Sequence, residues 1–247
     1  MMRLNKYLSS CGICSRREAD RLIEDGRVTV DGRTPELGLQ LSGQEQVCLD
    51  GKPVQPEADQ IYLAYYKPRG IVCTFEKKEK QNLLTNFSYP RRVTYAGRLD
   101  RESEGLLILS NDGDHMNRMM RARNAHEKEY VVTIDQKVTE DFLEKLQRGV
   151  YLPELAVTTR PCQVKKSGRC EFHIVLTQGL NRQIRRMCEA EGRKVLSLKR
   201  IRVMNIRIGD LKPGEYRDIE GEELRELLKA LEGEQDKNQK CKTSDEQ

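Results

Sequence analysis

The sequence predicts an α+β fold, because helical and extended segments follow one another irregularly along the chain. Apolar residues recur at helical spacing in some segments and at alternate positions in others, without the regular strand–helix–strand rhythm of a parallel α/β sheet. The chain has 247 residues, of which 37% are hydrophobic, and this is enough for packed cores of ordinary size. No apolar run reaches the roughly 18 residues of a membrane span, so we expect none.

The first segment, 2–59, begins with two short helices. Apolar residues at helical spacing predict the first. Ser15 has the position of an N-cap for the second, with Glu18 three residues later as in a capping box, and Gly26 ends that helix. Two short strands follow, each next to an Asp-Gly turn, at 28–30 and 47–49.

A linker at 52–60 leads into a larger domain that we expect to reach residue 232. Its extended segments are predicted at 61–66, 71–74, 93–96, 106–109, 126–134, 162–164, 170–176 and 195–208. Its helices are predicted within 75–92 and at 114–123, 139–147, 183–191 and 222–231. Residues 233–247 are charged and almost without apolar side chains, so we predict a disordered tail. The expected division is therefore 1–59, 60–232 and 233–247.

Charge is distributed unevenly along the chain. The formal net charge is +5, but 179–207 contains nine basic and two acidic residues. A basic concentration inside a folded region is typical of a contact with a polyanion. A solvated helix face is the alternative explanation.

Two segments could carry chemistry. In GRLDR, 97–101, Asp100 stands at a polar turn between two predicted strands, beside Arg98 and Arg101; a surface ion pair is the alternative. In GLNRQIRRM, 179–187, three arginines open a predicted helix, and they cannot all face the same way. One arrangement sends Arg185 inward, where a buried cation needs a carboxylate partner such as Asp100. The same arrangement leaves Arg182 and Arg186 on an outer face, where they could contact a nucleic acid.

These segments resemble motifs of the pseudouridine synthases that modify ribosomal RNA. The matching segments are YYKPRGIVCT at 65–74, GRLD at 97–100, EKEYVV at 127–132 and GLNRQIRRM at 179–187. SRREADRLIEDGRVTVDGR at 15–33 resembles the S4 RNA-binding module. The resemblance implies a small N-terminal S4-type domain and a catalytic domain with a mixed, largely antiparallel sheet flanked by helices. It also implies an RNA cleft and no metal or organic cofactor.

The resemblance also implies roles for individual residues. Asp100 would be the catalytic aspartate, Arg185 the cation paired with it, and Tyr130 the aromatic ring that stacks on the flipped uracil. An ordinary strand tyrosine is the alternative for Tyr130. We expect the remaining site residues to bind RNA: Arg16, Arg17, Lys67, Arg69, Arg98, Leu99, Arg101, Asn181, Arg182, Gln183 and Arg186. Solvated turns are the alternative for the pairs Arg16–Arg17 and Lys67–Arg69.

Cofactor and metal signals are weak. The sequence has neither a GxxxxGK[ST] loop nor a GxGxxG fingerprint. Cys11 and Cys14 have CxxC spacing, but no second ligand pair accompanies them. The eight cysteines are scattered and the N-terminus lacks the apolar core of a signal peptide. We therefore expect free thiols in a cytoplasmic protein and no metal site; Cys73 and Cys188 are expected in the core.

The prediction for function is isomerisation of a specific uridine to pseudouridine in ribosomal RNA. The residues of these motifs most resemble those of the large-subunit enzymes, so the expected substrate is 23S rRNA, and also a tRNA. The alternative target is 16S rRNA. A non-catalytic RNA-binding or ribosome-assembly factor is the alternative from a different class. We expect RNA to be the partner of a monomer.

Overall fold

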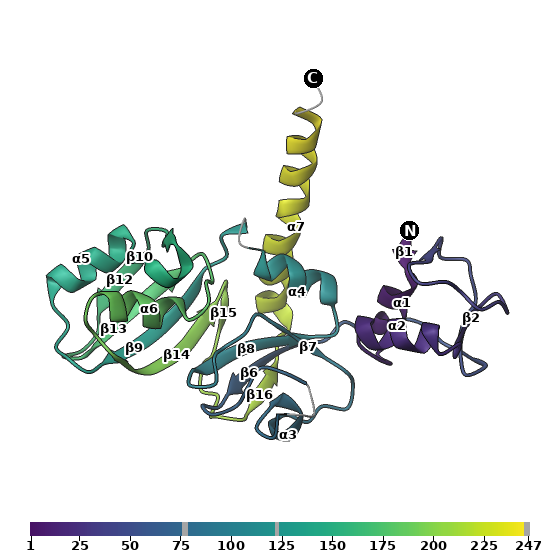
Figure 1. The fold of residues 1–247 in the computed structure, drawn as a ribbon, viewed down its shortest axis with the longest axis horizontal. Coiled ribbons are helices and arrows are strands. Elements are labelled where there is room, and N and C mark those ends of the chain that lie inside the picture. The colour runs from purple at the N-terminus through teal and green to yellow at the C-terminus, as the bar shows by residue number, and fades with distance from the viewer. Residues whose placement is uncertain (76–78, 122–123, 245–247) are drawn as a thin grey trace. The chain divides into compact units, whose positions relative to one another are not determined.

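The chain divides into two units, each with its own core, in a computed structural model that describes residues 1–75, 79–121 and 124–244 (Figure 1). The first unit comprises Met1–Ile61 with two short stretches, Tyr89–Thr94 and Ser110–Gly113. The second unit comprises the other described residues.

The first unit is built from short elements that local sequence signals define. They are β1 (Met2–Arg3), α1 (Leu4–Ser10), α2 (Arg16–Glu24), β2 (Val28–Val30), β3 (Gln40–Leu41), β4 (Val47–Leu49) and β5 (Lys52–Pro53). β1 pairs with β3, and β2, β4 and β5 form an antiparallel sheet. The predicted capping box is confirmed: Ser15 Oγ accepts from the Glu18 N–H, and a Glu18 carboxylate oxygen accepts from the Ser15 N–H.

The helices of this unit bury one face and expose the other. Leu4 and Leu8 of α1 and Ala19 and Ile23 of α2 pack with the β2–β4 strands in one core. The first turn of α2 points the other way, where Arg16 and Arg17 are exposed. A capped helix N-terminus with exposed arginines is suited to contact phosphate.

The second unit is a mixed sheet in the order β12-β13-β9-β14-β8-β6-β16, with β15 on β14 and β7 on β8. Its strands are β6 (Tyr62–Lys67), β7 (Thr94–Ala96), β8 (Glu104–Ser110), β9 (Lys128–Ile134), β12 (Gln163–Lys166), β13 (Glu171–Leu176), β14 (Val195–Val203), β15 (Ile206–Arg207) and β16 (Tyr216–Asp218). The β14–β8 pair is parallel, whereas β12–β13, β13–β9, β9–β14 and β6–β16 are antiparallel. The predicted mixed, largely antiparallel sheet is confirmed.

Helices cover the two halves of this sheet separately (Figure 1). They are α3 (Leu83–Asn86), α4 (Gly113–Met120), α5 (Glu140–Arg148), α6 (Gln183–Ala190) and α7 (Gly221–Ser244). The apolar faces of α5 and α6 pack on β9 and β13 in one core. Those of α4 and the start of α7 pack on β6 and β8 in another.

One predicted strand is absent, and several short strands were not predicted. Residues 71–74 form no strand but one isolated bridge, between Val72 and Asn82, because Pro68 and Gly70, with φ of +90°, end the extended run. The short hairpin of β10 (Tyr151–Leu152) and β11 (Val157–Thr158), joined by the 3-10 turn η2 (Pro153–Leu155), was not predicted, and neither was β16.

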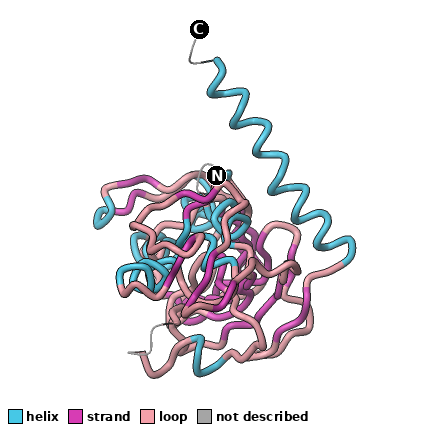
Figure 2. The backbone as a smooth tube through the Cα atoms, turned by 90° about the vertical axis from the view of Figure 1, so that its right-hand side faces the viewer, coloured by secondary structure: helices cyan, strands magenta, loops and turns pink. Residues whose placement is uncertain are grey.

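The last helix is longer than predicted. α7 continues to Ser244 as one helix (Figure 2), through the segment where we expected a disordered tail. Glu, Gln and Lys dominate this segment, and they are good helix formers even without an apolar face.

Candidate active site

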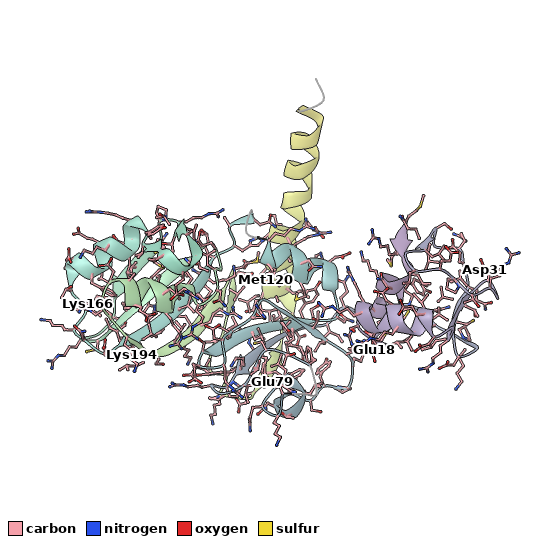
Figure 3. All side chains as sticks on the ribbon, viewed as in Figure 1. Glu18, Asp31, Glu79, Met120, Lys166 and Lys194 are labelled. Atoms are coloured by element: carbon pink, nitrogen blue, oxygen red, sulfur yellow. The ribbon has the colours of Figure 1, made fainter. Side chains whose placement is uncertain are left out.

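Asp100 lies in the turn between β7 and β8. Gly97 begins this turn with φ of +70°, and a Cβ there would lie 2.6 Å from Cε of Met120 at the end of α4 (Figure 3). The backbone conformation favours glycine, whereas the flexible end of the Met120 side chain could move away from a Cβ. Leu99 is buried, and its N–H donates to Sγ of Cys73 at 3.4 Å. The leucine anchors the turn and leaves the Asp100 side chain 32% exposed beside it.

The carboxylate of Asp100 borders a cavity of about 600 Å³. This volume is in the range of sites for small ligands and nucleosides. Segments that are far apart in the sequence line it, among them the turn after β7, the start of β9, the loop that enters α6, and β14. Eight of the predicted site residues meet there: Arg98, Leu99, Asp100, Arg101, Tyr130, Asn181, Arg182 and Gln183.

The charges around this cavity are unequal. Among the described residues that line it, Asp100 is the one carboxylate, against the five cationic side chains of Arg98, Arg101, Lys128, Arg182 and Arg200. Such an excess attracts the phosphates of a nucleic acid. A carboxylate opposes that attraction, so chemistry explains Asp100 better than binding does.

Arg182, and not Arg185, lies nearest to the carboxylate of Asp100. Nη1 of Arg182 is 4.0 Å from Oδ2 of Asp100. Arg182 is the N-cap of α6 and has a left-handed backbone, with φ of 51°. This conformation turns its side chain toward the cavity before the helix begins. The predicted Asp100–Arg185 pair is therefore wrong, because the irregular residue before the helix changed the direction of the first arginine.

Arg185 packs behind the turn that carries Asp100. Its Nη2 donates to the carbonyl oxygen of Glu102 at 3.0 Å and to Oγ of Ser103 at 3.4 Å, and its Nη1 donates to the carbonyl oxygen of Val195 at 3.3 Å. Burial lowers the pKa of Arg185, the nearby Arg182 lowers it further, and Asp100 raises it. Arg185 is not among the residues that line the cavity; it braces the turn from α6.

Arg186 faces away from the cavity. It forms an ion pair with Glu154, and its Nε donates to the carbonyl oxygen of Asn181 at 3.0 Å. It lines a different groove, beside β10 and the end of α5. The predicted arrangement, with Arg182 and Arg186 on one face, is therefore wrong, because Arg182 lines the cavity of Asp100 and Arg186 lines the groove that contains Glu154.

Lys67 and Arg69, which share one predicted turn, have different environments. Lys67 is the last residue of β6 and is 0% exposed, and its Nζ donates to the carbonyl oxygen of Pro68 at 2.8 Å. Burial lowers the pKa of Lys67 to about 8. It cannot reach RNA, so that prediction is wrong. Arg69 is exposed and forms an ion pair with Glu102 at 3.2 Å, outside the cavity lining.

The sequence analysis missed two cations in the cavity, Lys128 on β9 and Arg200 on β14. Lys128 is 6% exposed and Arg200 is 2% exposed. A signal for Lys128 was present: it stands two residues before Tyr130 in a strand, so both side chains share a face. Arg200 pairs with Tyr130 across the β9–β14 ladder, which the sequence alone did not reveal.

The cysteines near the site are not suited to nucleophilic chemistry. Burial raises the pKa of Cys73, and it raises the pKa of Cys188 to about 12. Both are buried, as predicted, and a thiol must ionise to act as a nucleophile. Seven cysteines are free thiols: Cys11, Cys14, Cys48, Cys73, Cys162, Cys170 and Cys188.

No group of three or more His, Cys, Asp or Glu side chains within residues 1–75, 79–121 and 124–244 is arranged to hold a metal ion. In the same part of the chain, none of the helices combines the length and apolarity that crossing a membrane requires.

Comparison with known proteins gives a consistent picture. The family model described as RNA pseudouridylate synthase matches residues 61–190, and the S4 domain model matches residues 2–41. The chain is 46% identical to the dual-specificity RNA pseudouridine synthase RluF of Salmonella typhi, over 94% of this chain and 80% of the relative. It is 33% identical to the ribosomal large subunit pseudouridine synthase B of Bacillus subtilis, over 92% of this chain and 96% of the relative.

A solved crystal structure of a pseudouridylate synthase has a similar fold. The TM-score is 0.67 at 25% sequence identity, over 93% of this chain and 100% of the other.

Proposed function

Because the chain belongs to the RNA pseudouridylate synthase family, with an N-terminal S4 domain, we propose that it isomerises a uridine of large-subunit ribosomal RNA, 23S rRNA, in the cavity around Asp100. The relative from Bacillus subtilis is named for the ribosomal large subunit, which favours 23S over 16S rRNA. The relative from Salmonella typhi is named for dual specificity, and we propose a tRNA as the second substrate.

The observation that carries this proposal is that Asp100 is the one carboxylate among the described lining residues of a cationic cavity large enough for one nucleoside. A protein that only binds RNA gains nothing from a carboxylate among its phosphate contacts, because that carboxylate repels phosphate. The residues of the cavity therefore favour an enzyme over a ribosome-assembly factor that only binds.

The reaction breaks the bond from N1 of uracil to C1′ and forms a bond from C5 to C1′. The target nucleoside must leave its stack and enter the cavity. There Asp100 would attack C1′, stabilise positive charge on the sugar, or remove the C2′ proton. Arg182 is the nearest cation, with its Nη1 4.0 Å from Oδ2 of Asp100.

Tyr130 extends from β9 into the same cavity. We propose that its ring stacks on the flipped uracil and that its hydroxyl transfers a proton late in the reaction, when C5 loses its hydrogen and N1 gains one. The atoms of substrate and product are the same, so the reaction consumes no cofactor.

We propose that the exposed cations at the cavity entrance, Arg98, Arg101 and Arg182, contact RNA phosphates, together with Arg16 and Arg17 of the S4 domain and Arg69. Leu99, Asn181 and Gln183 would shape the cavity wall against the nucleoside. We also propose that the protein acts as a monomer in the cytoplasm, where ribosomal and transfer RNA are made and modified.

Mapping pseudouridine in total RNA from cells with and without this gene tests the proposal. We expect the loss of one site in 23S rRNA and one in tRNA, and the return of both when the gene is restored. A loss confined to 16S rRNA would contradict the proposed target, and an unchanged map would contradict the proposed activity.

A further inference from the structure

Two buried cations that the proposed mechanism does not use line the cavity. Nζ of Lys128 donates to the carbonyl oxygen of His126 at 3.1 Å, and Nε of Arg200 donates to the carbonyl oxygen of Leu106 at 2.7 Å. Nη2 of Arg200 is buried and has no partner among the described residues. Within the same residues, neither side chain forms an ion pair.

Burying these charges is costly for the fold. A buried cation without a carboxylate partner destabilises the fold unless a ligand compensates its charge. The environment of Lys128 reflects this cost: burial lowers its pKa to about 8, and the nearby charge of Arg200 lowers it further. A fold that keeps two such groups beside one cavity indicates a functional site there.

The position of the pair identifies which part of the substrate it meets. Lys128 and Tyr130 are two residues apart on β9 and line the same cavity. Arg200, on β14, is the cross-strand partner of Tyr130. The two cations therefore lie beside the ring on which uracil would stack. The RNA phosphates remain on the backbone, near the exposed Arg98, Arg101 and Arg182 at the entrance, and the buried pair meets the base.

The chemistry creates a negative charge at that position. When the N1–C1′ bond breaks, its electron pair stays with uracil, and the charge spreads over N1 and the two carbonyl oxygens. The positive charge that the sugar develops is compensated by the carboxylate of Asp100 or removed by loss of the C2′ proton. When C5 then bonds to C1′, any bond from Asp100 to C1′ breaks, or the proton taken from C2′ returns to it. The C5 proton leaves and N1 takes up a proton, which completes the isomerisation.

We propose that Lys128 and Arg200 form a binding site for the negative charge of the detached uracil, and that both act as catalytic residues by contacting its carbonyl oxygens. The site holds the free base inside the cavity while it turns from N1 to C5. Fixed donors aimed at a developing charge are among the strongest contributions to catalysis. This inference rests on the proposed function.

The test uses Lys128→Met and Arg200→Met in the full chain. Each variant removes one charge and keeps an apolar side chain of similar length. Lys199→Met is the matched control, because Lys199 neighbours Arg200 on β14 but lies over the ring of Tyr66, outside the cavity lining. The substrate is a 23S rRNA fragment that spans the mapped uridine, made with uridine or with 5-fluorouridine at that one position.

Fluorine withdraws electrons and stabilises the uracil anion without help from the protein. We expect each cavity variant to lose roughly 100-fold or more in single-turnover rate with uridine, as for the loss of a donor to a developing anion. The loss should be at least about tenfold smaller with 5-fluorouridine, measured as disappearance of that nucleoside after digestion and mass spectrometry. RNA affinity should stay within about threefold, and Lys199→Met should change neither quantity.

Equal losses with both bases would overturn the inference and assign the pair a structural role. Weaker RNA binding at an unchanged rate would assign it to phosphate instead. Melting temperatures check folding, and Lys128→Gln, which keeps a polar side chain, serves if the methionine variant does not fold. A parent enzyme that forms no pseudouridine contradicts the proposed function, whereas an active parent with equally active variants contradicts this inference alone.

Discussion

The entrance and the floor of the cavity are both cationic, but they differ in exposure. Arg98, Arg101 and Arg182 at the entrance are exposed, whereas Lys128 and Arg200 at the floor are buried. Exposed cations remain hydrated and cost the fold little, so RNA affinity alone is reason enough to keep them. Buried cations destabilise the fold, and for Lys128 and Arg200 we propose that the charge which arises during the reaction is the reason to keep them. The comparison separates RNA binding from chemistry by depth, with Asp100 between them.

The largest expected effect is that of Asp100→Ala, which removes the one carboxylate among the described residues that line the cavity. Single-turnover isomerisation should fall by roughly 10⁴-fold or more, while the dissociation constant for RNA stays within about threefold because the entrance is intact. Stopped-reaction assays and binding titrations measure the two quantities. A rate within tenfold of the parent would show that the chemistry is carried elsewhere.

The next effect distinguishes the two arginines near Asp100. Arg182→Ala should slow single turnover by about 10- to 100-fold, because the nearest cation to the carboxylate is lost, and should leave the melting temperature almost unchanged. Arg185→Ala should lower the free energy of unfolding by about 2 kcal/mol, because its hydrogen bonds to Glu102, Ser103 and Val195 are lost. Melting curves and rates for both variants provide the check. The reverse pattern would restore the arrangement that the sequence suggested.

A smaller effect is expected at the entrance. Arg98→Ala should weaken RNA binding about 3- to 10-fold and lower the slope of log affinity against log salt by about one, with little change in the saturated rate. Arg186→Ala is the matched control, because Arg186 pairs with Glu154 on the far side of α6. Its salt slope should equal that of the parent. If the slope falls for Arg186→Ala and not for Arg98→Ala, RNA follows the other groove.

The smallest effect on function is expected for Lys67→Met, which replaces a buried cation outside the cavity. The pKa of Lys67 is about 8 in the folded protein, against an ordinary value of 10.5. Between these values the unfolded chain binds more protons than the folded one, so the stability of the parent rises as pH rises from 8 to 10.5. The variant should be more stable than the parent below pH 8, by roughly 1–3 kcal/mol, and should gain less on raising the pH. Urea unfolding at pH 7.5 and pH 10 measures the difference, and a parallel pH dependence would contradict it.

Local signals in the sequence predicted most of the backbone. The capping box of Ser15 and Glu18 and the N-cap Thr139 of α5 depend on residues three or four positions apart, and both are present. Asp100 and Tyr130 meet in one cavity because of the order of strands in the sheet. Local signals do not predict that order, so this meeting was predicted only from the resemblance of whole motifs.

The direction of individual cations was harder to predict. The left-handed residue Arg182 precedes α6 and changes which arginine reaches Asp100. Lys67 was expected in a solvated turn but ends a central strand, between the neighbours β8 and β16. Charge in a sequence suggests exposure, and for that reason the buried Lys128 and Arg200 were missed.

The measurement that tests the central claim most directly is pseudouridine mapping in cells that lack the chromosomal gene and carry the parent or Asp100→Asn. Asparagine keeps the size of the side chain and removes its charge. We predict that the parent restores the missing pseudouridine in ribosomal RNA, and that Asp100→Asn leaves this position as uridine although the variant is folded and binds the same RNA. Full restoration by Asp100→Asn would contradict the assignment of the chemistry to this cavity.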